Sequence, residues 1–141
     1  MNLTITIYTR LNNALPAGTR TMSWDEFCED YPAMGWVSKA RAKRPNFNFT
    51  RKQDLPLWSP VKLKDGTTRG NKNVEAVFAL CLDFDGNAPV DDVEELWSDN
   101  LMCVHTTWSH TEQKPHARVI IALSRPVSVE EHGKLVRWAM R

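Results

Sequence analysis

The sequence lacks the features of a membrane protein, a disulfide-stabilised scaffold or a zinc ribbon. No apolar run approaches the roughly 20 residues needed to cross a bilayer. The N-terminus has neither a basic start nor a cleavage site, so it does not resemble a signal peptide. The only three cysteines, Cys28, Cys81 and Cys103, are far apart, and two of them lie in apolar runs. We therefore expect reduced, buried thiols in a cytoplasmic protein with no membrane partner.

Repeats and low-complexity segments are also absent, and the charge is unevenly spread. The 141 residues, of which 42% are hydrophobic and 25% charged, predict one domain over 1–141 with an ordinary core. Between Lys39 and Lys72 there are ten basic and two acidic residues, a net charge of +8. From residue 73 onward there are six basic and eleven acidic residues, a net charge of −5. A basic segment beside an acidic pocket suits a polyanion held near a metal ion, although a solvated basic face is the simpler alternative.

The N-terminal part, 1–73, predicts a strand, a short helix and an irregular basic segment. Alternating apolar and β-branched residues indicate the strand, and a capping box in which Glu26 follows Ser23 by three residues indicates the helix. Prolines and glycines interrupt the basic segment, and its aromatic residues could stack nucleic-acid bases or pin the loop to the core. The expected elements are a strand over 3–8, a loop over 11–21, a helix from Ser23 to about Tyr31 closed by Pro32, and an irregular segment over 39–73 with a short extended piece near 61–63.

The second part, 74–141, predicts the order β-α-β-β-α. Its strands follow from apolar, β-branched runs, and its helices from apolar residues at helical spacing. The fold class is therefore α+β, with a ferredoxin-like or RNA-recognition-like core lacking its final strand. Either the N-terminal strand or a longer parent protein would supply that strand. The expected elements are a strand ending at Asp85, a helix within 87–99, a hairpin of 101–107 with 118–123 ended by Pro126, and a helix from a capping box at Ser128 and Glu131 to the C-terminus.

Polar side chains follow the first two of these strands at the point where each ends. Asp83 and Asp85 close the first, and Ser109 and His110 follow the second. A crossover helix makes the two strands parallel, so they end at one edge of the sheet, where ligands bind in open α/β sheets. Residues i and i+2 of a strand share a face, so both carboxylates can reach one Mg²⁺ or Mn²⁺ ion. Alternatively, the acidic residues and Gly86 only form a turn, and the histidine is a buried, hydrogen-bonded ring.

Five motifs follow one another in order over residues 55–138, at residues 55–60, 69–74, 83–86, 106–115 and 118–127. This ordered set resembles the archaeo-eukaryotic primase, or primase-polymerase, superfamily, especially its phage, plasmid and mobile-element members. The resemblance implies a nucleotidyltransferase core that makes primers on a DNA template from nucleoside triphosphates, with a helicase domain in a longer parent protein as a further partner. It implies that Asp83 and Asp85 hold the divalent metal, that His110 and Ser109 contact the triphosphate, and that Arg118 reaches a phosphate.

Whether the chain is an enzyme stays open. The superfamily uses a third acidic residue on a later strand, whereas only Glu112, Glu130 and Glu131 follow His110. We therefore expect either that the sequence stops before this residue or that the chain is a reduced relative, and a non-catalytic module that binds nucleic acid or protein, including as an inhibitor, is one alternative. A metal-dependent phosphoesterase or nuclease using the same carboxylates is another. The residues that we expect to contact nucleic acid are Arg41, Lys43, Arg44, Arg51, Lys52, Arg69 and Lys72.

Overall fold

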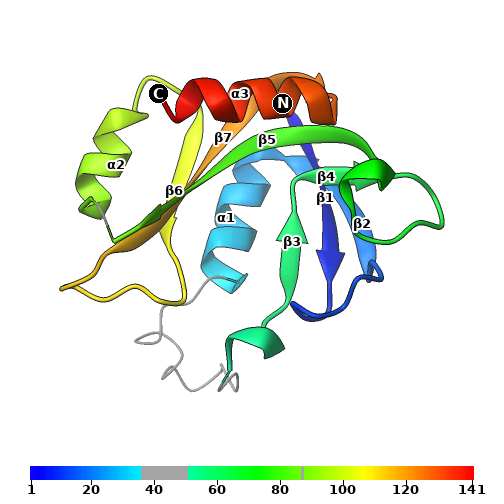
Figure 1. Cartoon of the computed structure of the whole chain (residues 1–141), viewed down its shortest axis with the longest axis horizontal. Coiled ribbons are helices and arrows are strands. Elements are labelled where there is room, and N and C mark those ends of the chain that lie inside the picture. The colour runs from blue at the N-terminus through cyan, green and yellow to red at the C-terminus, as the bar shows by residue number, and fades with distance from the viewer. Residues whose placement is uncertain (36–50, 87) are drawn as a thin grey trace.

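The chain folds into two antiparallel sheets and three α-helices (Figure 1). The structure, a computed structural model, describes residues 1–35, 51–86 and 88–141, and the side chains of all of these except 30–35. The predicted α+β class is confirmed. None of the helices in the described ranges is both long and apolar enough to cross a membrane.

The first sheet is built from the N-terminal part of the chain and has the strand order β2-β1-β3, with antiparallel neighbours. The expected loop over 11–21 is wrong at its end, because residues 18–21 belong to β2. This edge strand pairs with β1 along its whole length but is largely exposed, so it lacks the apolar alternation that would reveal it. The elements of this part are β1 (Asn2–Tyr8), β2 (Gly18–Ser23), α1 (Trp24–Gly35), a 3₁₀ turn (Lys52–Asp54) and β3 (Leu57–Ser59).

The second sheet has the order β4-β5-β7-β6. Both β5 and β6 pair antiparallel with β7, so they run parallel to each other with β7 between them. The predicted hairpin of 101–107 with 118–123 is confirmed, with Val104 opposite Val119. Its elements are β4 (Val61–Leu63), a 3₁₀ turn (Asn71–Asn73), β5 (Val74–Asp85), α2 (Val90–Leu96), β6 (Met102–Thr106), β7 (His116–Val127) and α3 (Val129–Ala139).

The element order from β5 to α3 is the predicted β-α-β-β-α. The edge position beside β5 is taken by β4, the short extended piece expected within the basic segment, rather than by the N-terminal strand. The prediction that this unit is ferredoxin-like stays an interpretation, as does the division at residue 73.

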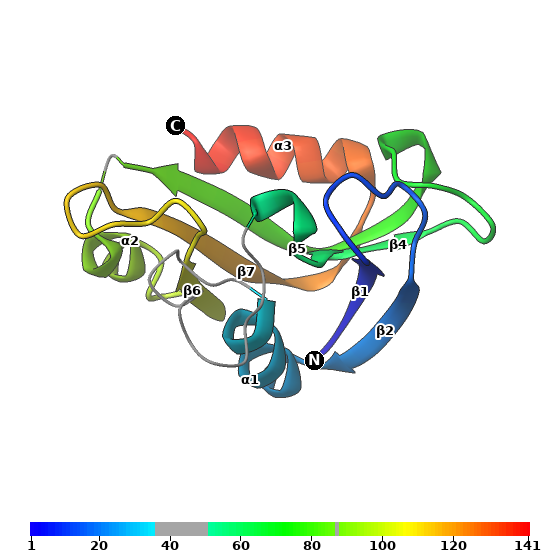
Figure 2. The ribbon, with the colours of Figure 1, turned by 90° about the horizontal axis from the view of Figure 1, so that it is seen from below.

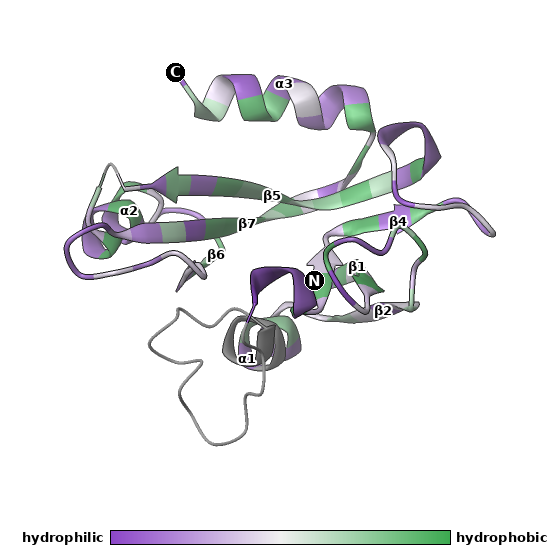
Figure 3. Cartoon of the chain, turned by 60° about the horizontal axis from the view of Figure 1, so that its bottom comes forward, coloured by the Kyte–Doolittle hydropathy of each residue, from purple (hydrophilic) through white to green (hydrophobic). Residues whose placement is uncertain are grey.

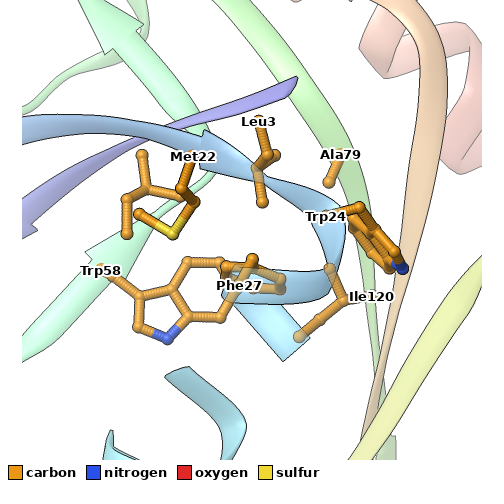
Figure 4. Close-up of a cluster of buried hydrophobic side chains, with 8 residues drawn as sticks. Leu3, Met22, Trp24, Phe27, Trp58, Ala79 and Ile120 are labelled. Atoms are coloured by element: carbon orange, nitrogen blue, oxygen red, sulfur yellow. The ribbon is translucent and has the colours of Figure 1, made fainter. Parts of the chain in front are cut away.

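Two hydrophobic clusters hold these layers together, one on each face of the second sheet. The first contains Phe27 of α1 and Trp58 of β3, whose rings meet edge to face with centroids 5.0 Å apart (Figure 4). It joins the first sheet and α1 to Ala79 of β5 and Ile120 of β7. The second cluster packs α2 and α3 against the opposite face, which carries Leu80. Figure 2 shows β5 and β7 with α3 on one side and α1 on the other.

Local signals account for the helix starts better than for the ends of elements. In α1 the Glu26 carboxylate accepts from the Ser23 N–H at 2.7 Å, and Ser128 with Glu131 forms the second predicted capping box. However, α1 continues through Pro32 to Gly35, so the expected end is wrong: proline removes one amide donor without forcing a helix to stop. Likewise, β7 includes Pro126 and ends at Val127, beside an irregularity in its pairing with β5.

Candidate functional site

The two predicted carboxylates lie opposite two basic side chains of the neighbouring strand. In the β5–β7 register, Asp83 faces Arg118 and Asp85 faces His116. Ala79 belongs to the same face of β5 and is buried in the first cluster, whereas the two aspartates are exposed beyond it. Figure 3 shows hydrophobic and hydrophilic residues alternating along both strands. The i, i+2 argument for a shared face therefore applies to the acidic and the basic pair alike.

Arg118 holds Asp83 through two hydrogen bonds. Its Nε donates to Oδ1 at 2.6 Å and its Nη2 donates to Oδ2 at 2.9 Å. The Arg118 side chain is 23% exposed and that of Asp83 is 48% exposed. Burial of the guanidinium lowers the pKa of Arg118, but the hydrogen bonds and charge of Asp83 outweigh this and leave that pKa raised. Arg118 is therefore charged, and its two-point geometry fixes the Asp83 carboxylate.

Asp85 is held from the other side by His116. The His116 Nδ1 lies 3.0 Å from Oδ1 of Asp85, and the imidazole is largely buried. The backbone N–H of His116 donates to Nδ1 of His110 at 3.2 Å. The predicted histidine and carboxylate are thus linked through a second histidine, which sequence reasoning did not assign to the site. Its place at i−2 from Arg118 becomes informative only once the register with β5 is known.

Asp83, Asp85 and Arg118 border a cavity of about 140 Å³ between the two halves of the chain. The second half of the chain contributes Asp83 and Asp85 of β5, Arg118 of β7, and Thr107 and Trp108 from the loop after β6, and the first half contributes an apolar wall together with one cation. Ser109 and His110 are not among the described residues that line it. From the first half, the lining residues are Leu11, Lys52, Leu55, Pro56 and Leu57.

Two neutral side chains lie near Arg118. His105 lies opposite Arg118 on β6, and burial lowers its pKa, so its ring is neutral near pH 7. Burial likewise raises the pKa of the Cys81 thiol to about 12, which keeps it protonated. All three cysteines are free thiols. The charges of Asp83 and Asp85 both raise the pKa of Arg118.

The donor set suits a hard divalent cation. Asp83 and Asp85 offer exposed carboxylate oxygens to one cavity, as Mg²⁺ and Mn²⁺ sites require. The described part of the chain contains no group of three or more His, Cys, Asp or Glu residues arranged for a metal ion. A cation held here would complete its coordination with ligand oxygens or water, as Mg²⁺ commonly does beside phosphates.

Those residues expected to contact nucleic acid that the structure describes are dispersed. Lys52 lines the cavity, whereas Arg51 pairs with Asp54 at 2.8 Å. The Arg69 guanidinium lies 5.4 Å from the centre of the Tyr8 ring and also donates to a backbone carbonyl. Lys72 is exposed. The other three expected residues, Arg41, Lys43 and Arg44, lie outside the described residues.

Comparison with known proteins identifies a family. The family model described as VapE N-terminal domain matches residues 20–140. This family is associated with phages and plasmids and is related to primases. No curated protein and no solved structure matches the chain.

Proposed function

The chain belongs to the VapE N-terminal domain family, and from this membership and the cavity we propose that it is a phage or plasmid replication module that binds a nucleoside triphosphate with Mg²⁺ or Mn²⁺ for primer synthesis. One observation carries this proposal: two carboxylates and two cations, from separate parts of the chain, line the same small cavity. This is the combination that phosphoryl chemistry needs. The reaction would take place in the cytoplasm, with a helicase domain of a longer parent protein as partner.

Asp83 and Asp85 would hold the divalent cation through their exposed oxygens. When bound, the cation would neutralise negative charge on the phosphates during nucleotidyl transfer. The protein contributes orientation, because Arg118 fixes one carboxylate and His116 fixes the other. Positioning and charge neutralisation supply most of the rate enhancement in such transfers.

The remaining lining residues suit the rest of a nucleotide. Arg118 and Lys52 would contact phosphate oxygens, and Thr107 offers a hydroxyl group. The apolar wall, which includes Leu55 and Leu57, together with Trp108, suits the sugar and the base. His110 would act from the rim, with Ser109 beside it.

The test is nucleotide binding as a function of the metal. We expect Mn²⁺-dependent binding of a nucleoside triphosphate that is lost in the double variant Asp83→Ala/Asp85→Ala, measured by calorimetry. The control Glu94→Ala/Glu95→Ala removes the same charge from an exposed part of α2 and should leave binding unchanged. Template-dependent primer synthesis should follow the same pattern. Metal-dependent binding that survives in the Asp83/Asp85 variant would contradict the proposal.

A second candidate function is a non-catalytic nucleic-acid-binding module. The observation that favours it is the engagement of Asp83 by Arg118, together with the lack of a third metal ligand in the described ranges. Single-stranded DNA binding would then fall steeply with salt and be weakened by Lys52→Ala and Arg69→Ala. The Asp83→Ala/Asp85→Ala variant would bind DNA as well as the unmodified chain does, and neither would bind triphosphate with metal.

A further inference from the structure

Arg118 occupies both oxygens of a carboxylate that the proposed function assigns to the metal. The two bonds, at 2.6 and 2.9 Å, leave Asp83 only its remaining lone pairs for a cation. We propose that this two-point ion pair makes the site bind a metal ion and a phosphate-bearing ligand together, and discriminate against either one alone. The inference rests on the proposed function and concerns how its ligands are loaded.

The charge of the cavity supports coupled loading. Its ionised lining side chains are Lys52, Arg118, Asp83 and Asp85, which sum to zero. A divalent cation alone would leave the cavity with an excess of two positive charges, and a triphosphate alone would leave it strongly negative. In a metal–triphosphate pair the two opposite charges partly cancel, which matters most where water is partly excluded.

The geometry gives the coupling a physical path. A metal ion that recruits Asp83 must displace the guanidinium or share the carboxylate with it, and Arg118 is only 23% exposed. A partly buried cation that loses its carboxylate is destabilised unless another anion replaces it. A phosphate in the same cavity supplies such an anion, with the fork geometry that a guanidinium prefers.

The converse also holds. A phosphate that recruits Arg118 releases Asp83, whose uncompensated charge then favours a metal ion. Because coupling between two ligands is reciprocal, each should raise the affinity for the other by the same factor. Arg118 is thus a specificity-determining residue. Its ion pair with Asp83 disfavours binding of the metal ion alone and favours binding of the metal ion together with a phosphate-bearing ligand.

The experiment measures Mn²⁺ binding without nucleotide, and deoxynucleoside triphosphate binding in EDTA and with Mn²⁺. In Arg118→Gln we expect the affinity for Mn²⁺ alone to rise on the order of tenfold, as for loss of one charge-assisted pair, while triphosphate enhances it less than in the unmodified chain. The matched control is Arg125→Gln. Arg125 lies on the same strand as Arg118 but does not line the cavity, and it forms an ion pair with Glu131 at 2.7 Å. The control should bind both ligands as the unmodified chain does.

A second variant tests the same ion pair by changing Asp83 in place of Arg118. Asp83→Asn should bind metal poorly yet bind triphosphate in EDTA several-fold more tightly, because Arg118 is released. It also serves if Arg118→Gln does not fold, as judged by thermal melting. Unchanged Mn²⁺ affinity in a folded Arg118→Gln, or unchanged triphosphate affinity in Asp83→Asn, overturns the inference. If metal-dependent binding is still lost in Asp83→Ala/Asp85→Ala, the proposed function survives that result.

Discussion

His116 lies directly opposite Asp85 in the β5–β7 register, with its Nδ1 3.0 Å from the Asp85 Oδ1. The two residues are 31 positions apart, and the antiparallel pairing of β5 with β7 brings them together. A carboxylate this exposed would sample several rotamers if it had no partner. The buried imidazole therefore sets the direction in which Asp85 presents its second oxygen.

We expect His116→Ala to weaken metal-dependent triphosphate binding about tenfold, the usual effect of removing a group that orients a metal ligand. His116→Asn should recover much of that loss, since its amide can still donate to Asp85. Calorimetric titration of both variants checks this, with His132→Ala as a control on α3. Equal losses in the alanine and asparagine variants would show that the ring acts only through packing.

Gly86 directly follows the last residue of β5, and its φ of +79° is a conformation that other residues adopt at a cost. Gly86→Ala should lower the free energy of unfolding by about 1 kcal/mol. It should also disturb triphosphate binding, because an added Cβ would lie 2.9 Å from Cε of Lys114, and Gly86 directly follows Asp85 in the chain. Urea unfolding and binding measurements together test this.

Gly66 provides the matched control for that variant. Its φ is +71°, but within the described part of the chain no atom beyond its two neighbours lies within 4 Å of an added Cβ, and Gly66 does not line the cavity. Gly66→Ala should therefore show a similar loss of stability with normal binding. The interpretation fails if both variants, or neither, change the affinity.

Phe27 anchors the cluster that joins the two sheets, and it is fully buried against Trp58. Phe27→Ala should lower the free energy of unfolding by about 3–5 kcal/mol, through lost burial and the cavity left behind. Leu96→Ala, at a side chain that is 68% exposed, should change it by less than about 0.5 kcal/mol. Chemical denaturation measures both, and similar losses would mean that the cluster does not carry the packing of α1.

Acid should weaken the start of α3 through Glu131. A hydrogen bond from Arg125 and one from the Ser128 backbone lower the pKa of Glu131 from 4.5 to about 2. Since the pKa is lowered on folding, the stabilisation is fully present above about pH 4.5 and is lost as the pH falls to about 2. The melting temperatures of the unmodified chain and of Glu131→Gln should differ above this window and converge below it. A difference that stays constant from pH 6 to pH 2 would contradict this assignment, and Glu95→Gln serves as the control.

Strong local patterns predicted the second half of the chain well. The apolar run before Asp83 and the β-branched run after Arg118 gave β5 and β7, and the Ser128–Glu131 capping box gave the start of α3. The exposed edge strand β2 carries no apolar alternation, and it forms because β1 offers free backbone groups. Its existence therefore depends on a partner that local reasoning does not see.

The candidate site was predicted in part for the same reason. Spacing alone places Asp83 and Asp85 on one face, and the resemblance to primases drew attention to Arg118. Their pairing with Arg118 and His116 depends on the register of two strands more than 30 residues apart, which no local pattern specifies. Lys52 lines the cavity because the two halves of the chain pack together, whereas the sequence identifies it only as one of several basic residues.

The cavity draws its acidic wall from one half of the chain and its apolar wall, around Leu55 and Leu57, from the other. The two walls can therefore diverge at different rates. Substitutions in the leucine-bearing segment could retune which base or sugar is accommodated while the carboxylates stay fixed, so a lineage could acquire a new nucleotide preference without altering its chemistry.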